Sequence, residues 1–177
     1  IGSFFAQLDL YITIHQRKLE NLKKLKTGLL QKMFPKNNQQ FPDFRFPEFT
    51  DAWEQRKLGE IINSYSGGTP SISNPKYYGG DIPFIRSGEI GLDKTELFLT
   101  TEGLNNSSAK LVLKGDILYA LYGATSGEVS RSLINGAINQ AILAIKPNDS
   151  YCSEFISQWL KSKKTRITSN YLQGGQG

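Results

Sequence analysis

A heptad pattern that ends at a proline constrains this chain more than any other feature. Ten positions between residues 1 and 33 step alternately by four and three, and eight of them are apolar. This spacing predicts one long helix whose apolar stripe packs against a second helix, as in a coiled coil. The stripe residues that we expect to pack are Phe5, Leu8, Ile12, Leu19, Leu22, Leu29 and Met33. Pro35 forbids continuation, so the helix is roughly 50 Å long.

The residue pattern changes twice after this helix. Residues 35–51 contain three prolines and four phenylalanines without periodicity, which predicts an extended linker. From residue 52 onward, short apolar runs alternate with glycine turns. We expect strands within 56–65, 82–86, 117–122 and 138–145, a short helix at 105–110 and an amphipathic helix at 151–168.

The predicted fold class is therefore α+β. A β-rich domain with short helices occupies residues 52–177, and one long coiled-coil-type helix over residues 1–34 precedes it. The chain begins at Ile1 and stops inside a glycine-rich run. We therefore expect a fragment of a longer protein that is truncated at its C-terminal end.

The rarity of cysteine and histidine excludes several kinds of site. The chain has one of each, Cys152 and His15, in different segments. This excludes a disulfide framework, a zinc site of Cys and His, and a Cys–His nucleophilic pair. No apolar run approaches the roughly 20 residues that a membrane-spanning helix needs. We predict no metal site and no membrane segment, and we expect a cytoplasmic protein.

Signatures of catalysis and of nucleotide cofactors are missing from the sequence. There is no phosphate-binding Gly-Lys-Ser/Thr loop and no dinucleotide-binding fingerprint. The carboxylates of the second half are scattered, without the paired spacing typical of hydrolytic sites. We therefore predict no catalytic residue and no cofactor bound by this chain.

The formal charge of +5 is distributed unevenly. Residues 1–34 hold six basic and two acidic side chains, whereas residues 35–51 sum to −1 and the remainder to +2. A second basic cluster lies between Lys161 and Arg166. This distribution is typical either of a surface that binds a polyanion or of a solvated basic face.

Polar, glycine-flanked loops at predicted strand ends are the remaining candidates for function. Glycines let a backbone approach phosphates, Ser and Thr donate to them, and Arg makes bidentate contacts to guanine. The candidate DNA-contacting residues are Ser66, Gly67, Thr69, Lys76, Tyr78, Arg86, Ser87, Glu89, Tyr122, Thr125, Ser126 and Arg131. Turn chemistry alone favours the same residue types. In that alternative, Arg86 pairs with Glu89 and Arg131 pairs with Glu128 on the surface.

The order of these features resembles the specificity subunits of type I restriction-modification enzymes. The segment LDLYITIHQRKLENLKKLKTGLLQKMFP (8–35) is similar to their central conserved helix, and FTDAWEQRKLGEI (49–61) is similar to the entry into their second target recognition domain. The resemblance continues through SGGTPS (66–71), YYGGDIPFIRSGEI (77–90), LKGDILYALYGATSGEV (113–129) and INQAILAI (138–145).

The resemblance implies a non-catalytic module that binds double-stranded DNA and reads one half of a bipartite target. The implied partners are modification (methyltransferase) subunits, which use S-adenosylmethionine to methylate an adenine, and restriction (endonuclease-translocase) subunits, which use ATP and Mg. It further implies that two long helices pack antiparallel and hold two recognition domains apart. One alternative is a coiled-coil assembly module with a β-rich domain that binds protein or carbohydrate. Another is a fragment of a single-chain methyltransferase.

Overall fold

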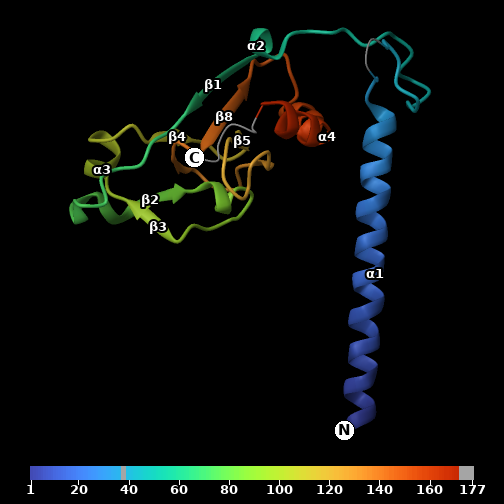
Figure 1. Ribbon diagram of the computed structural model, residues 1–177, viewed down its shortest axis with the longest axis horizontal. Helices are drawn as coiled ribbons and strands as arrows, with labels where there is room; N and C mark the ends of the chain where they lie inside the picture. Colours follow the sequence, from blue (N-terminus) through green and yellow to red (C-terminus); the bar gives the residue numbers. More distant parts are fainter. Residues whose placement is uncertain (37–38, 172–177) are drawn as a thin grey trace. The chain divides into compact units, whose positions relative to one another are not determined.

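The computed structural model describes residues 1–36 and 39–171, and the chain forms two compact units, Ile1–Gln55 and Arg56–Gly177. The first unit contains α1 (Gly2–Met33) and the segment that follows it, and the second contains the strands (Figure 1). The α+β fold class is confirmed. The boundaries that we predicted at residues 34 and 51 stay predictions.

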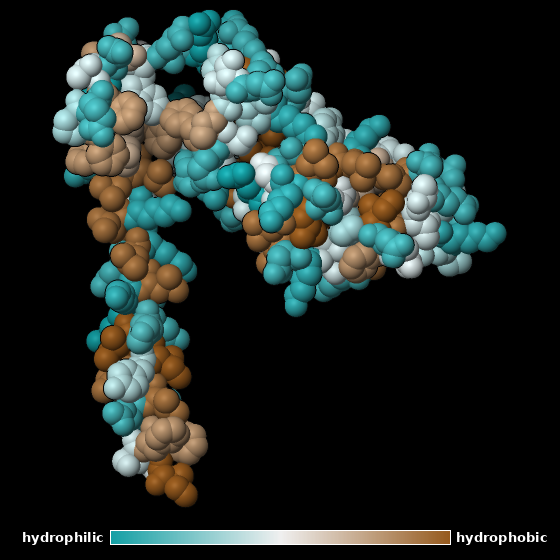
Figure 2. Space-filling view, turned by 180° about the vertical axis from the view of Figure 1, so that it is seen from behind, coloured by the Kyte–Doolittle hydropathy of each residue, from teal (hydrophilic) through white to brown (hydrophobic). Residues whose placement is uncertain are grey.

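α1 is a single helix of 32 residues in which no side chain is buried. It ends at Phe34, whose extended backbone (φ −100°, ψ 136°) suits a residue that precedes proline. Except for the half-buried Met33, the predicted stripe is exposed to solvent, and Ile12 and Leu22 are both 54% exposed. Figure 2 shows hydrophobic side chains exposed along the length of this helix. Such a helix is stabilised by a packing partner more than by its intrinsic propensity.

The segment after α1 folds back on the end of the helix. The Phe44 N–H donates to the carbonyl of Lys32 (3.0 Å), and the Trp53 N–H donates to the carbonyl of Gln40 (2.8 Å). The Arg45 guanidinium donates to two backbone carbonyls five and six residues further along the chain. The segment that we expected to be an extended linker therefore contains turns that are tied to the last turn of α1.

The strands of the second unit form two four-stranded sheets. Sheet A is antiparallel, in the order β1 (Ile62–Ser66), β8 (Ile142–Pro147), β5 (Ile117–Ala120) and β6 (Val129–Arg131). Sheet B has the order β3 (Leu97–Leu99), β2 (Tyr78–Ile85), β7 (Gly136–Ile138) and β4 (Lys110–Val112). In sheet B the central pair, β2 and β7, is parallel, and the outer pairs are antiparallel. The remaining elements are α2 (Leu58–Ile61), η1 (Pro75–Tyr77), η2 (Ser87–Glu89), α3 (Thr101–Asn105) and α4 (Ser153–Tyr171).

Three hydrophobic clusters stack the two sheets and two helices into layers. The middle cluster joins the facing sides of the sheets, for example through Leu118 of β5 and Ile138 of β7. The second cluster packs the other side of sheet A against α4 through Ile156 and Leu160. The third covers the outer side of sheet B, where Leu104 of α3 packs. Side chains alternate between the faces of a strand, so neighbours in β5 and β7 enter different clusters.

Three predicted elements differ in the structure. The run 138–145 is not one strand, because it is divided between β7 and β8 by a polar turn at Asn139 and Gln140. The short helix predicted at 105–110 lies earlier, at α3, because the Thr100 side chain accepts from the Gly103 N–H and caps the helix there. The run 56–65 contains α2 before β1. The predicted C-terminal amphipathic helix is confirmed as α4.

Candidate nucleic-acid interface

The parallel pairing of β2 and β7 brings two polar loops to one end of sheet B. Ile85 is aligned with Ile138 in this pair, so Arg86 and Asn139 leave neighbouring strands at the same level. The Asn139 side chain accepts from the Ala141 N–H (3.2 Å), which closes the turn between β7 and β8. Segments that are 53 positions apart in the sequence therefore emerge side by side (the pair Ile85↔Ile138).

The glycine loop after β1 lies against the same end of the sheet. A Cβ atom at Gly67 would lie 1.8 Å from the carbonyl oxygen of Ile138, and one at Gly68 would lie 1.9 Å from Ser108 Oγ. These glycines are therefore required for close packing of the loop, independently of any phosphate. The packing places Thr69, whose hydroxyl donates to Gln140 Oε1 (2.6 Å).

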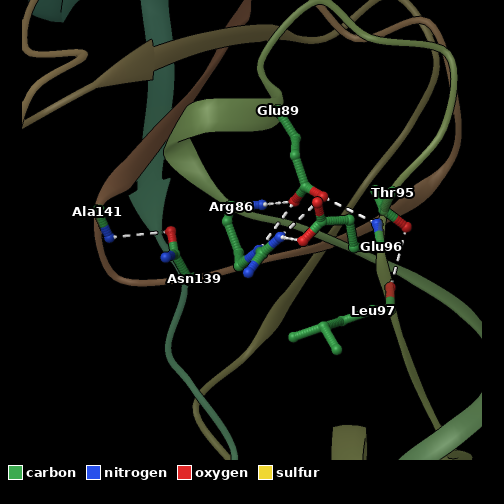
Figure 3. Close-up of polar contacts among 7 residues, drawn as sticks. All are labelled: Arg86, Glu89, Thr95, Glu96, Leu97, Asn139 and Ala141. Atoms are coloured by element: carbon green, nitrogen blue, oxygen red, sulfur yellow. Dashed lines mark hydrogen bonds and ion pairs between the residues drawn. The ribbon is translucent and has the colours of Figure 1, made fainter.

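Arg86 and Glu89 form the most extensively bonded polar cluster of this region (Figure 3). The Glu89 carboxylate accepts from the Arg86 backbone N–H (2.9 Å), from Arg86 Nε and Nη2 (3.2 Å each) and from the Glu96 N–H (2.9 Å). The Glu96 side chain accepts from Arg86 Nη2 on the solvent side. The pairing of Arg86 with Glu89 that we gave as an alternative is therefore present, and Glu96 is a second partner.

The environment keeps both partners of this cluster charged. Hydrogen bonds to Glu89 and then to Glu96 raise the pKa of Arg86, and burial opposes them only in part. Burial raises the pKa of Glu89, but the donors from Arg86 and from the backbone outweigh it and hold that pKa below its usual value. Glu89 is 8% exposed, so its charge is held by these donors rather than by water.

Two hollows flank η2 and share Gly88. One, of about 340 Å³, lies between the η2 loop and the β5–β6 connection and is lined by Ser87, Gly88, Ile90, Gly91, Thr125, Glu128, Val129 and Ser130. The other, of about 560 Å³, is lined by Arg86, Gly88, Glu89, Leu92, Lys94, Thr95 and Glu96. The first hollow brings together two loops that the sequence analysis selected separately.

The β5–β6 connection is attached to α4 rather than projecting from the domain. Gly127 has a φ of +78°, and a Cβ there would lie 2.5 Å from Thr168 Cγ2. Glu128 pairs with Lys164 of α4. Within this connection Thr125 lines the hollow, whereas Tyr122 is exposed and Ser126 donates its N–H to Gly123.

Arg131 lies at the end of β6 and is directed to α4. Its Nη1 donates to Glu154 (3.0 Å), and its Nε donates to the Gly115 carbonyl (3.3 Å). The pairing with Glu128 that we considered is wrong, because α4 brings Glu154 to Arg131 and Lys164 to Glu128. Two cations that we considered for DNA contact thus have carboxylate partners.

The other predicted contact residues have mainly local roles. The Tyr78 hydroxyl donates to the Pro70 carbonyl (2.7 Å), and burial raises its pKa. Ser66 is paired in sheet A with Leu143. Lys76 is exposed on η1. None of these contacts tests DNA binding, so the twelve residues stay predictions as DNA contacts.

Sequence reasoning missed several residues of the candidate interface. They are Lys94, Glu96, Ser130, Asn139 and Gln140. The last two carried a usable signal, since a polar pair interrupts the otherwise apolar run 138–145. No sequence signal marked Glu96, because only the folded loop brings its side chain to Arg86.

The described residues, 1–36 and 39–171, hold no group of three or more His, Cys, Asp or Glu side chains that could bind a metal ion. Within the same residues, no helix is both long and apolar enough to cross a membrane.

Comparisons with known proteins all identify components of type I restriction-modification systems. The model of the family described as "Type I restriction modification DNA specificity domain" matches residues 50–177. The HindI specificity subunit of Haemophilus influenzae, a type I restriction enzyme component, is 31% identical over 129 residues, which are 70% of this chain and 28% of that protein. The MjaIX specificity subunit of Methanocaldococcus jannaschii is 28% identical over 131 residues, 71% of this chain and 29% of that protein.

A solved structure shares the fold. The crystal structure of the HsdS subunit from Thermoanaerobacter tengcongensis superposes with a TM-score of 0.62 at 16% identity, covering 94% of this chain and 39% of that one. The match to the two curated relatives named above, HindI and MjaIX, spans less than a third of their length.

Proposed function

Because this chain belongs to the type I restriction-modification DNA specificity domain family, we propose that it is a DNA-reading part of a type I specificity subunit. It binds double-stranded DNA and reads one half of a bipartite target. The family match covers all of the second unit, Arg56–Gly177, called the β-rich unit from here on, so we assign the reading to that unit.

The observation that carries the proposal is the convergence of three loops at one end of sheet B. Backbone pairing and the Thr69–Gln140 hydrogen bond bring together a guanidinium, two carboxamides and hydroxyl groups from the segments after β1, β2 and β7. These groups are the donors and acceptors that read base edges in the major groove. This convergence favours DNA reading over a protein- or carbohydrate-binding domain.

The chain itself performs no chemistry in this proposal. Modification subunits bind S-adenosylmethionine and methylate an adenine, which must leave the base stack to be reached. Restriction subunits use ATP and Mg to translocate and cleave. The complex acts in the cytoplasm, and this chain selects the site.

The apolar stripe of α1 has a structural role in the same proposal. It packs against another helix of the complete specificity subunit and sets the separation of two recognition units. A helix of roughly 50 Å matches the axial length of about 15 base pairs, which is a reasonable scale for such a separation.

Methylation-site sequencing tests the function. Cells that express the modification subunit together with a specificity subunit carrying this chain should methylate one bipartite motif, and cells without the specificity subunit should not. The affinity of the assembled complex should also fall by orders of magnitude between about 50 and 200 mM salt, as phosphate contacts require. Absence of any motif, together with binding that salt does not weaken, would refute the proposal.

A further inference from the structure

The buried Glu89 carboxylate holds one edge of the Arg86 guanidinium. Glu89 accepts from Nε and Nη2, the two nitrogens on one edge of the planar group. Among the residues that the structure describes, none accepts from Nη1. The end of the guanidinium formed by Nη1 and the outer hydrogen of Nη2 is therefore the part that an incoming acceptor would meet, and the Arg86 side chain is 39% exposed.

The two carboxylates that contact Arg86 differ in how firmly they are held. The Glu89 side chain is 9% exposed and also accepts from two backbone N–H groups, so it is fixed by the fold of the η2 loop. The Glu96 side chain is 79% exposed and contacts Arg86 only at Nη2. Exposed ion pairs of this kind contribute little free energy, so Glu96 is easily displaced.

The charge of this cluster argues against a phosphate as the incoming acceptor. Arg86 with Glu89 and Glu96 sums to −1, and even with Lys94 of the same hollow the cluster is not positive. A phosphate would be repelled by the two carboxylates. A guanine edge is uncharged and presents O6 and N7, which match two parallel N–H donors.

We propose that Arg86 reads a guanine of the DNA target, that Glu89 is the positioning residue that orients its guanidinium, and that Glu96 is the carboxylate that the guanine displaces. This inference rests on the proposed function and adds the identity of one base contact. Because Glu89 is anchored to the backbone, Arg86 loses little side-chain freedom on binding and keeps a fixed direction.

The test is methylation-site sequencing of cells that express the complete complex with one substitution at a time. Arg86→Gln should relax one guanine of the wild-type motif, with discrimination at that position reduced about 5- to 150-fold, as expected for a lost bidentate contact. Glu89→Gln should relax the same position and leave the others unchanged. If Glu89 has a purely structural role, Glu89→Gln should instead lower methylation of all sites without changing the preference at any base position of the motif.

Three further variants test the displaced carboxylate, the charge and the guanidinium geometry. Glu96→Gln should keep the motif and bind the cognate duplex about 1.4- to 5-fold more tightly, since an exposed competitor is removed. Lys114→Gln is the charge control for Arg86→Gln: it removes one positive charge from an exposed turn outside the three loops and should keep the motif and affinity. Arg86→Lys keeps the charge beside Glu89, so it serves if Arg86→Gln fails to fold, and it should relax the same guanine.

The outcomes separate this inference from the proposed function. If wild type methylates a bipartite motif and the Arg86 and Glu89 variants methylate the identical motif, the base contact is refuted and the function stands. Equal weakening on every sequence by Arg86→Gln would identify a phosphate contact and also refute it. Loss of the motif in Glu96→Gln would contradict the displacement. If wild type itself gives no motif, the proposed function fails.

Discussion

α1 and the β-rich unit differ in how far their apolar side chains are buried. α1 leaves its stripe exposed and buries no side chain, whereas the β-rich unit buries its apolar residues in three clusters between two sheets and two helices. Within its own unit the stripe of α1 is exposed, except at the half-buried Met33, whereas the buried clusters of the β-rich unit form from residues of that unit alone. We therefore expect substitutions in the α1 stripe to disrupt assembly with other subunits, and substitutions in the core of the β-rich unit to disrupt folding.

The largest effect is expected from charges in the stripe. Replacing Leu22 and Leu29 together by Asp should abolish assembly with modification subunit, because each buried leucine contributes about 2 kcal/mol and a buried charge costs more. Size-exclusion chromatography of the complex measures it. Lys24→Asp, which lies off the stripe, is the control and should assemble. Normal elution of the double variant with its partner would show that the stripe is not an interface.

A core substitution in the β-rich unit should act on folding. Ile142 is 0% exposed between the sheets, so Ile142→Ala should lower the free energy of unfolding by about 2 to 5 kcal/mol. Ile72→Ala, at a side chain 82% exposed, should change it by less than about 0.5 kcal/mol. Denaturant titration measures both. Equal effects at the two positions would contradict the layered core.

The glycine loop should show a smaller, steric effect. Gly67→Ala places a Cβ 1.8 Å from the Ile138 carbonyl oxygen and must displace the loop, at a cost of about 1 to 3 kcal/mol. Gly88→Ala is the matched control, since nothing lies within 4 Å of its Cβ position. Thermal unfolding compares the two variants. A Gly67→Ala protein as stable as Gly88→Ala would mean that the loop is not packed on β7.

The smallest expected effect is on how the stability of the fold depends on pH in the acidic range. The pKa of Glu89 is lower in the folded chain than its ordinary value, so the ionised carboxylate stabilises the fold above that ordinary value. This stabilisation is lost as the pH falls from there through the folded pKa. Glu89→Gln should therefore lose less stability than wild type between about pH 5 and pH 3. Identical acid profiles for the two proteins would contradict the role of Glu89 as a charged acceptor.

Local signals explain what the sequence predicted well. The position of α1 follows from a heptad pattern and from Pro35, both of which act within a few residues. The position of α4 follows from apolar residues four apart, such as Ile156 and Leu160. The overlap of the resemblance with residues 50–177 also agrees with the family match.

Long-range pairing explains what the sequence did not predict. The run 138–145 has a strand-like composition throughout, and only the Asn139 turn assigns its two halves to different sheets. The partner of Arg131 comes from α4, 23 residues away (the contact with Glu154). Register and sheet order decide such contacts, and neither has a local pattern.

The central claim is that the β-rich unit reads DNA while α1 assembles and spaces the complex. Exchanging residues 56–177 for the matching segment of a relative with a different motif, with α1 unchanged, tests it most directly by methylation-site sequencing. The account predicts that one half of the bipartite motif changes, whereas the other half and the spacing are retained. An unchanged motif, or a change in the spacing alone, would contradict it.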